Sequence, residues 1–300
     1  MGKLEIETQM IFVNILGGIG NQMFQYAFGY AISQKKRGFF KLDISDFKTY
    51  SMRNYELGLF NINTAFAFKE EVEKLKYKDE NIFAKVLRKV RKKERTLSEQ
   101  YYKEPHFNFD QKVYDIKEDV YFEGYWQSER YFKKYRKDLL KQFSLSKEIH
   151  LHSQQYKIKI ENTESVSLHI RRGDYVTCTQ ANSVHGTCTL DYYKDAVLII
   201  EEKVKSAHFF IFSDDLDWVK VNLDFIENIT FVELAEDIPD HEEMFLMSQC
   251  KHNIIANSSF SWWGAWLNKN PDKIVLAPNK WFNDSSINTQ DLIPEGWIRL

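Results

Sequence analysis

The sequence of 300 residues is poor in the residue types that mark irregular, disulfide-stapled or membrane-spanning chains. It holds only 12 glycines and five prolines, which excludes collagen-like and low-complexity proteins. Its three cysteines, Cys178, Cys188 and Cys250, form no CxxC pair, so we expect no disulfide framework and a reducing compartment. No apolar run approaches the ~20 residues of a membrane-spanning helix.

Neither sign of charge dominates, since 41 lysines and arginines oppose 43 aspartates and glutamates for a net charge of −2. A general nucleic-acid-binding surface is therefore not expected. The first ten residues, MGKLEIETQM, lack the apolar core of a signal peptide, which favours a cytoplasmic protein. Hydrophobic residues at 43% and aromatic residues at 15% are sufficient for a sizeable core in one large or two ordinary domains.

Short apolar runs alternate with helix-like spacings along most of the chain. The pattern predicts strands over 10–16, 39–44, 121–126, 166–171, 208–212, 229–234, 253–256 and 273–277. It predicts helices over 21–38, 128–143 (capped by Ser128), 190–206, 242–251 and 260–268. This alternation indicates an α/β protein with parallel sheets. A boundary in the polar stretch 144–164 would give domains 1–150 and 151–300.

One segment, Lys85–Arg95 (KVLRKVRKKER), is strongly basic with Val86, Leu87 and Val90 between the charges. Such a helix can lie on the anionic inner face of a membrane as a peripheral contact, or hold phosphate. The alternative, and the usual fate of a charge run, is a solvated helix face.

A glycine-rich turn, Gly18-Ile19-Gly20-Asn21-Gln22-Met23, joins the first expected strand to the first helix. With Asp43 at the end of the next strand, it matches part of a nicotinamide-dinucleotide fingerprint. Met23 stands where that fingerprint needs Gly or Ala for close packing. The same geometry also offers the bare N–H groups of a helix N-terminus to any anion.

Two charged motifs follow later strands. In His169-Ile170-Arg171-Arg172-Gly173-Asp174 the arginine forks suit a phosphate, although Asp174 could instead lock one of them in a structural bridge. Asp215-Leu216-Asp217 resembles a DxD motif that holds a divalent ion against a diphosphate. We favour the alternative, in which Asp214 or Asp215 caps a helix and Asp217 faces its dipole.

Two further loops are polar. Asn257-Ser258-Ser259-Phe260-Ser261 precedes a tryptophan-rich helix and forms a second anion cradle. The loop 177–190 contains His185 between Cys178 and Cys188, but a fourth ligand and paired spacing for zinc are missing.

Five segments, taken together and in order along the chain from Gly17 to Pro278, resemble the α-1,2-fucosyltransferases of glycosyltransferase family 11. They are Gly17–Tyr26, Phe122–Ser128, His169–Asp174, His185-Gly186 and Asn257–Trp263. The resemblance implies a GT-B fold, in which two Rossmann-like domains with parallel sheets face each other. It also implies inverting transfer of L-fucose from GDP-β-L-fucose to the 2-hydroxyl of a terminal β-galactoside, such as lactose or a surface-glycan repeat unit.

The same resemblance assigns roles to residues of this chain. Arg171 would grip the β-phosphate, Arg172 and Asp174 would shape its site, and Glu243 would read guanine. Asp174 and His185 are candidates for the base, so the expected catalytic set is Arg171, Asp174 and His185. The expected donor-binding set is Gly18, Gly20, Asn21, His169, Arg171, Arg172, Ser213, Asp214, Glu243, Asn257, Ser258, Ser259, Phe260 and Ser261. No metal or other cofactor is expected, because Arg171 and a helix N-terminus can stabilise the departing diphosphate.

Two rival functions remain at this level. The first is a nicotinamide oxidoreductase that uses Gly18, Gly20 and Asp43. The second is a non-catalytic glycan-binding module that uses the tryptophans, for which the arginine pair and the two anion cradles would be superfluous.

Overall fold

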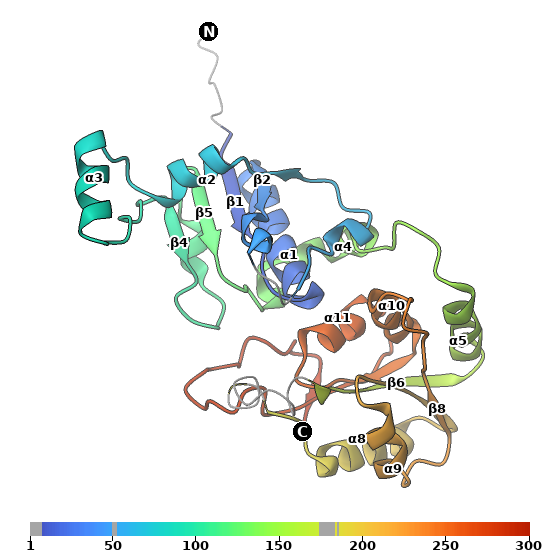
Figure 1. Ribbon diagram of the computed structural model, residues 1–300. Helices are drawn as coiled ribbons and strands as arrows, with labels where there is room; N and C mark the ends of the chain where they lie inside the picture. The colour runs from blue at the N-terminus through green and yellow to red at the C-terminus, as the bar shows by residue number, and fades with distance from the viewer. Residues whose placement is uncertain (1–7, 50–52, 174–183, 185) are drawn as a thin grey trace. The chain divides into compact units, whose positions relative to one another are not determined.

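The computed structural model describes residues 8–49, 53–173, 184 and 186–300, and it is an α/β protein (Figure 1). The chain divides into two compact units. Unit 1 comprises Met1–Ser146 with Gln290–Leu292, and unit 2 comprises Lys147–Thr289 with Ile293–Leu300. No helix among the described residues is both long and apolar enough to cross a bilayer.

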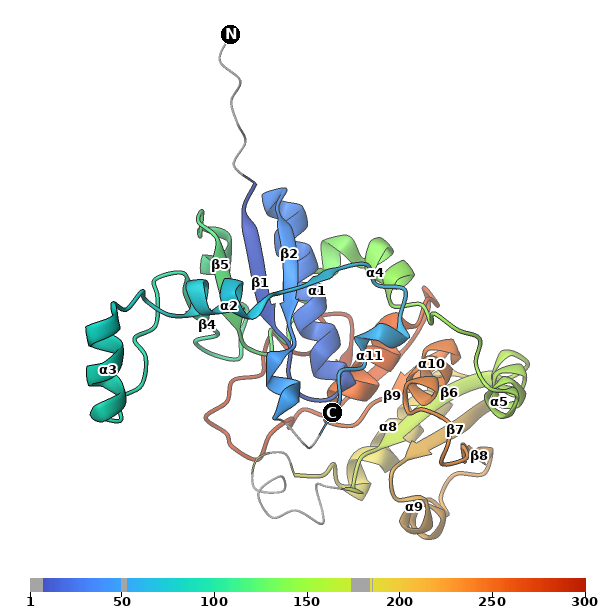
Figure 2. The ribbon, with the colours of Figure 1, turned by 45° about the horizontal axis from the view of Figure 1, so that its top comes forward.

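Unit 1 is built on a five-stranded sheet in the order β3-β2-β1-β5-β4, with every neighbouring pair parallel (Figure 2). Its strands are β1 (Met10–Asn14), β2 (Phe39–Asp43), β3 (Ala65–Phe66), β4 (Tyr101–Lys103) and β5 (Val120–Glu123). Its helices are α1 (Ile19–Lys36), α2 (Lys69–Lys76), α3 (Ile82–Val90) and α4 (Arg136–Gln142). Alternate residues of β1 point to opposite faces, so Phe12 packs on α2 while Val13 meets Gly29 of α1.

Unit 2 carries a six-stranded parallel sheet in the order β11-β10-β9-β6-β7-β8. Its strands are β6 (Glu164–Ile170), β7 (Ala207–Ser213), β8 (Ile229–Phe231), β9 (His252–Ile254), β10 (Val275–Ala277) and β11 (Ile298–Arg299). Its helices are α5 (Leu151–Glu161), α8 (Leu190–Lys203), α9 (Leu216–Asn222), α10 (His241–Gln249) and α11 (Ser259–Leu267).

Both faces of this second sheet are covered by helices. Phe209 and Ile211 of β7 pack with α8 and α9, whereas Phe210 and Phe212 pack with α5 and α10 on the other face. A strand that is buried on both faces reads as a continuous apolar run, which is why the sequence reveals it. The predicted fold class, α/β with two parallel-sheet domains of the GT-B type, is confirmed.

Helix α5 lies within the stretch 144–164 and is not among the predicted elements, because Leu151 and Ile158 of this helix are exposed while Ile160 is buried. One predicted helix starts later in the chain than expected. The helix expected from residue 128 begins only at Arg136. Ser128 instead caps a 3-10 turn, because the buried rings of Tyr131 and Phe132 must both enter the core.

Candidate active site

The carboxyl ends of β6 and β7 bring the expected arginines together with acidic side chains. Ile170 pairs with Ser213 in the parallel register, so Arg171 and Asp214 leave the sheet side by side. Arg171 Nη1 donates to Asp214 Oδ2 at 2.9 Å, and the Arg172 backbone N–H donates to Asp214 Oδ1 at 2.8 Å. A Cβ on Gly173 would lie 2.5 Å from Asp214 Oδ2, so glycine leaves room for this carboxylate.

Arg172 is held separately from Arg171. Its Nε donates to Asp215 Oδ2 at 2.9 Å, and its guanidinium lies 3.9 Å from the centre of the Trp218 ring. Asp215 is also the N-cap of α9, where Oδ1 accepts from the Trp218 N–H at 3.2 Å. The favoured interpretation of the DxD motif as a helix cap is therefore confirmed for Asp215, while Asp217 is an exposed residue in the first turn.

Glu243 on α10 belongs to the same cluster. Burial together with the nearby Asp240 and Asp214 carboxylates raises the pKa of Glu243 to about 8, although the Arg171 guanidinium acts in the opposite direction. A carboxyl group with this pKa is largely protonated at neutral pH in the absence of a ligand. Perturbed pKa values of this kind are typical of functional sites.

His169 is the next-to-last residue of β6, two positions before Arg171. It is buried, its ring centroid is 5.9 Å from that of Phe260, and its Nδ1 has no hydrogen-bond partner within the described part of the chain. Burial and the neighbouring Arg171 charge lower the pKa of His169 to about 3, so the ring is neutral.

The cradle expected before α11 is built largely by side chains that hold their own loop. Ser258 caps the helix by accepting from the Phe260 N–H, and the Ser261 hydroxyl donates back to the carbonyls of Ala256 and Ser258. Asn257 is buried and donates to the carbonyls of Gly186 and Trp281. Ser259 and Phe260 are only half-buried, and they are the side chains of this loop best placed for a ligand.

Ser213 ends β7 and has a supporting contact. Its hydroxyl accepts from the Asp215 N–H at 3.1 Å and so shapes the turn that carries Asp214.

Taken together, these contacts of unit 2 bring the ionisable side chains of Arg171, Asp214 and Glu243 into one group, with His169 and Phe260 beside them.

The glycine-rich turn lies at the corresponding edge of the sheet of unit 1. Gly17 has a φ of 86°, which favours glycine, and Gly18 is the N-cap of α1. Gly20 is buried in the first turn of that helix, and the half-buried Asn21 accepts from Gln127 Nε2 at 2.7 Å.

Sequence reasoning missed the side chains that fix this edge of unit 1. Gln22 bonds the carbonyls of Gly17 and Asn54, and Gln25 joins the Leu16 N–H to the Gly124 carbonyl. Glu104, after the very short β4, accepts from the backbone N–H groups of Tyr125 and Trp126 at 2.7 and 3.0 Å. Burial raises the pKa of Glu104 to about 7, although these two hydrogen bonds lower it. A three-residue strand gave no sequence signal for this position.

Asp43, the ribose ligand of the nicotinamide interpretation, makes internal contacts. It is buried and accepts from the Tyr121 hydroxyl at 2.7 Å and from the Ser45 N–H at 2.9 Å, so each carboxylate oxygen already accepts a hydrogen bond within unit 1. Burial raises the pKa of the Cys188 thiol to about 11, which keeps it protonated. Asp174, Cys178 and His185 lie outside the described residues. In the part of the chain that the structure describes, no three His, Cys, Asp or Glu side chains gather as metal ligands do.

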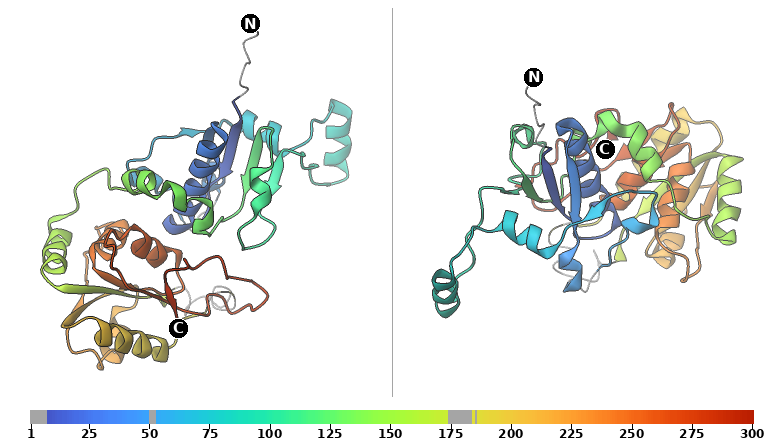
Figure 3. Two further views of the ribbon diagram at one scale, coloured as in Figure 1. Left: turned by 180° about the vertical axis from the view of Figure 1, so that it is seen from behind. Right: turned by 90° about the horizontal axis from the view of Figure 1, so that it is seen from above.

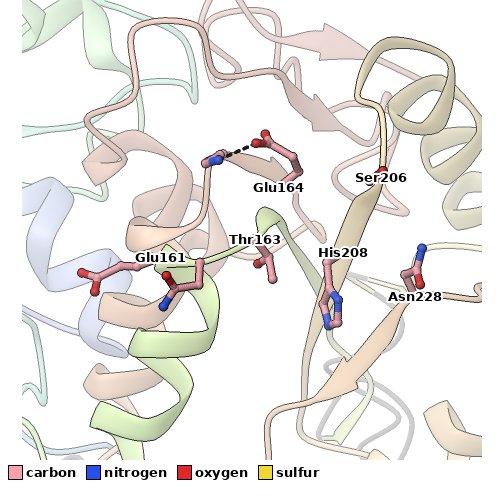
Figure 4. Close-up of a pocket in the computed structure, with 8 residues that line it drawn as sticks. Glu161, Thr163, Glu164, Ser206, His208 and Asn228 are labelled. Carbon is pink, nitrogen blue, oxygen red and sulfur yellow. Dashed lines mark hydrogen bonds and ion pairs between the residues drawn. The ribbon is translucent and has the colours of Figure 1, made fainter.

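Two of the surface pockets formed by described residues of unit 2 lie at opposite edges of its sheet. One, of ≈ 770 Å³, is lined by Glu161, Thr163 and His208 at the amino ends of β6 and β7, the edge opposite the arginine cluster (Figure 4). The other, of ≈ 590 Å³, is lined by residues including Thr187, Asn257 and Trp281 at the carboxyl ends of β9 and β10. Ligands of parallel sheets bind at carboxyl edges, and of the expected donor-binding residues Asn257 lines this second pocket.

Comparison with known proteins supplies the chemical context. The model of the family "Glycosyl transferase family 11" matches residues 10–300. An alpha-1,2-colitosyltransferase of Escherichia coli is 37% identical over 97% of this chain and 99% of its own length. The O-antigen biosynthesis glycosyltransferase WbnK, also of Escherichia coli, is 34% identical over 95% and 98% of the two chains. The crystal structure of fucosyltransferase NodZ from Bradyrhizobium shares the fold, with a TM-score of 0.51, 12% identity, and coverage of 86% and 93%.

Proposed function

The chain belongs to glycosyltransferase family 11, and on that premise we propose that it transfers L-fucose from GDP-β-L-fucose to the 2-hydroxyl of a terminal β-galactoside, with inversion at the anomeric carbon. The single observation that carries the proposal is the cluster of Arg171, Asp214 and Glu243 at the carboxyl edge of unit 2. In this cluster Arg171 is a cation that can bind phosphate, and Glu243 is a carboxyl group that can accept hydrogen bonds from the N1–H and exocyclic amine of guanine.

In the proposed reaction the galactose 2-hydroxyl attacks the anomeric carbon while the bond from that carbon to the β-phosphate oxygen breaks. Negative charge grows on the departing GDP, and Arg171 stabilises it as a preorganised donor. Asp214 already holds the Arg171 guanidinium at 2.9 Å, so little reorganisation is needed when the charge develops. The hydroxyl proton passes to a base, for which Asp174 and His185 remain the candidates.

Donor recognition is assigned to unit 2. Glu243 would accept from N1–H and the exocyclic amine of guanine, and Ser259 and Phe260 would contact the phosphates and nearby groups. In unit 1, Gly18, Gly20 and Asn21 at the N-terminal end of α1 are the residues proposed to contact substrate. The acceptor class is a galactoside such as lactose or a glycan repeat unit, which the relationship to an O-antigen glycosyltransferase supports.

A second candidate donor is GDP-colitose, because a relative 37% identical over nearly the whole chain is an alpha-1,2-colitosyltransferase. Colitose is L-fucose without the 3-hydroxyl. A site that hydrogen-bonds this hydroxyl should reject colitose by about 10⁴-fold, whereas an apolar lining should discriminate only weakly.

The test of the proposed function is a panel of GDP-sugars and galactoside acceptors, with the product linkage determined by NMR. Formation of an α-1,2-linked fucoside supports the proposal. Turnover of GDP-colitose alone would assign the second candidate, and reduction of a nicotinamide cofactor would refute both.

Binding of GDP-fucose should strengthen as the pH rises from about 6 to about 8.5, because the Glu243 carboxyl must lose its proton to accept from guanine. Calorimetry in buffers of different ionisation enthalpy should show proton release on binding near neutral pH. Glu243→Gln should bind more weakly, release no proton and discriminate less between guanine and adenine donors. The exposed Glu236→Gln is the matched control. Unchanged donor affinity in Glu243→Gln would show that another residue reads the base.

The same Glu243→Gln substitution should raise the melting temperature at pH 8 but not at pH 4. The pKa of the Glu243 carboxyl is about 8 in the folded protein, against its ordinary value of 4.5. As the pH rises from 4.5 to 8, the cost of ionising this buried carboxyl therefore lowers the stability of the wild type more and more, and glutamine avoids that cost. Gain of stability with loss of binding is the expected signature of a functional carboxylate.

Activity in excess EDTA should remain within a few-fold of activity in magnesium or manganese. A cation and a metal ion are alternative ways to neutralise a leaving diphosphate, and Arg171 with Arg172 provides the first. Asp215→Asn should clearly lower the melting temperature, because Asp215 caps α9 and binds Arg172. The turnover of this variant should change little. Asp217→Asn should likewise change stability more than turnover. Silencing by EDTA with recovery in manganese would restore the metal-binding interpretation of the DxD motif.

A further inference from the structure

Helix α3 exposes an uninterrupted apolar stripe. Ile82, Phe83, Val86, Leu87 and Val90 have exposed fractions of 85%, 77%, 55%, 37% and 75%, and no residue of the helix is buried. At about 100° per residue these five side chains fall within an arc of roughly 140° on one face. Figures 1 and 3 show α3 standing away from the sheet of unit 1.

Polar contacts nevertheless hold this helix in place, and they leave its apolar stripe exposed. Asn81 caps it by accepting from the Ala84 N–H at 2.8 Å. Arg88 Nε bonds both carboxylate oxygens of Glu80, at 2.8 and 3.0 Å. The returning chain is anchored by Arg95, which binds Glu73 at 3.3 Å and lies 4.2 Å from the Tyr77 ring centre. A contiguous exposed apolar surface beside polar residues is typical of an interaction site.

Basic side chains border the stripe. On the helical projection Lys85 and Lys89 lie along one edge of it, and Arg91, Lys92 and Lys93 follow its C-terminal end. Unlike Arg88 and Arg95, these five make no ion pair with any residue that the structure describes. Glu94 is the only acid between Lys85 and Arg95. The charge beside the stripe is therefore positive and available.

We propose that α3 docks the protein onto the surface of an anionic lipid bilayer. The apolar stripe enters the interface and the lysines and arginines contact lipid headgroups, the arrangement of an interfacial amphipathic helix. Charge complementarity selects this occupant over a second copy of the chain, because a symmetric contact would place the two basic clusters against each other. The proposal extends beyond sugar transfer and does not depend on it.

The test is flotation of the full chain with phosphatidylcholine vesicles, with and without phosphatidylglycerol, in the absence of sugar nucleotide. Wild-type protein should float with the anionic vesicles and much less with the neutral ones, and added salt should weaken binding. Phe83→Ser/Val90→Ser should reduce binding roughly tenfold or more. Lys85→Gln/Lys89→Gln should reduce it about fivefold for each lysine removed.

The matched control is Leu151→Ser/Val221→Ser, which removes two side chains that are 77% and 76% exposed on α5 and α9. This control should float like the wild type, and all three variants should keep the wild-type circular dichroism spectrum and transfer to a soluble acceptor. Absence of wild-type flotation, or equal loss in the control, would overturn the proposal. A concentration-dependent dimer in sedimentation that Phe83→Ser/Val90→Ser abolishes would assign the stripe to a second copy instead.

Discussion

Replacing Arg171 by alanine should lower kcat/KM for sugar transfer by about 10²–10³-fold while the protein stays folded. The guanidinium is the cation aimed from the end of β6 toward the proposed diphosphate, and alanine leaves nothing in its place. Stability should change little, because the Arg171 and Asp214 side chains are 25% and 26% exposed and such partly solvated pairs contribute only about 0–1 kcal/mol. Asp214 also keeps its hydrogen bond from the Arg172 N–H.

Steady-state kinetics beside thermal melts would check this result, with Arg172→Ala as the matched variant. Arg172 is bound to Asp215 and stacked on Trp218, so its loss should lower the melting temperature more and turnover less than the loss of Arg171. Arg171→Lys should recover only part of the rate, because an ammonium group cannot make two-point contact with phosphate. An active Arg171→Ala enzyme, or one that is merely unfolded, would end the assignment.

Replacing Trp126 by alanine should lower the free energy of unfolding by about 3–5 kcal/mol. The indole is completely buried and stacks on Phe28 with ring centroids 4.1 Å apart, while Phe122 and Tyr131 meet it edge-on. Alanine would leave a cavity among these three rings.

The loss should extend to the candidate site in unit 1. Trp126 has a φ of 57°, and its backbone N–H donates to Glu104, so the ring and this hydrogen bond together fix the loop in which Gln127 donates to Asn21. Urea denaturation should show the loss, and the neighbouring Tyr125→Ala, at a position 42% exposed, should change stability by less than about 1 kcal/mol. Comparable stability of the two variants would contradict the role given to Trp126.

The strand and helix pattern of this protein could be predicted from its sequence because periodicity belongs to contiguous residues. The apolar run of β7 is continuous, since helices cover both faces, and the glycines after β1 and the serines after β9 mark the carboxyl ends of those strands. The motif resemblance likewise depends on short contiguous segments, and the family match over residues 10–300 agrees with it. The shortest strands were not predicted. Strands β3 and β11 have two residues each, too few for a periodic pattern, and they form by pairing with β2 and β10.

The partners of the charged side chains were decided by the tertiary structure alone. The sequence offered Asp174 as a residue that could lock one of the arginines, and Asp174 lies outside the described residues. Asp214, a carboxylate that binds Arg171, comes from the next strand of the sheet, through the register that pairs Ile170 with Ser213. Asp43, at the end of β2, similarly resembled a ribose ligand, but it binds the hydroxyl of Tyr121 on β5, two strands away in the same sheet. A buried charge is stabilised by whichever opposite or polar group is nearest in space, and strand register, which no local pattern contains, determines that neighbour.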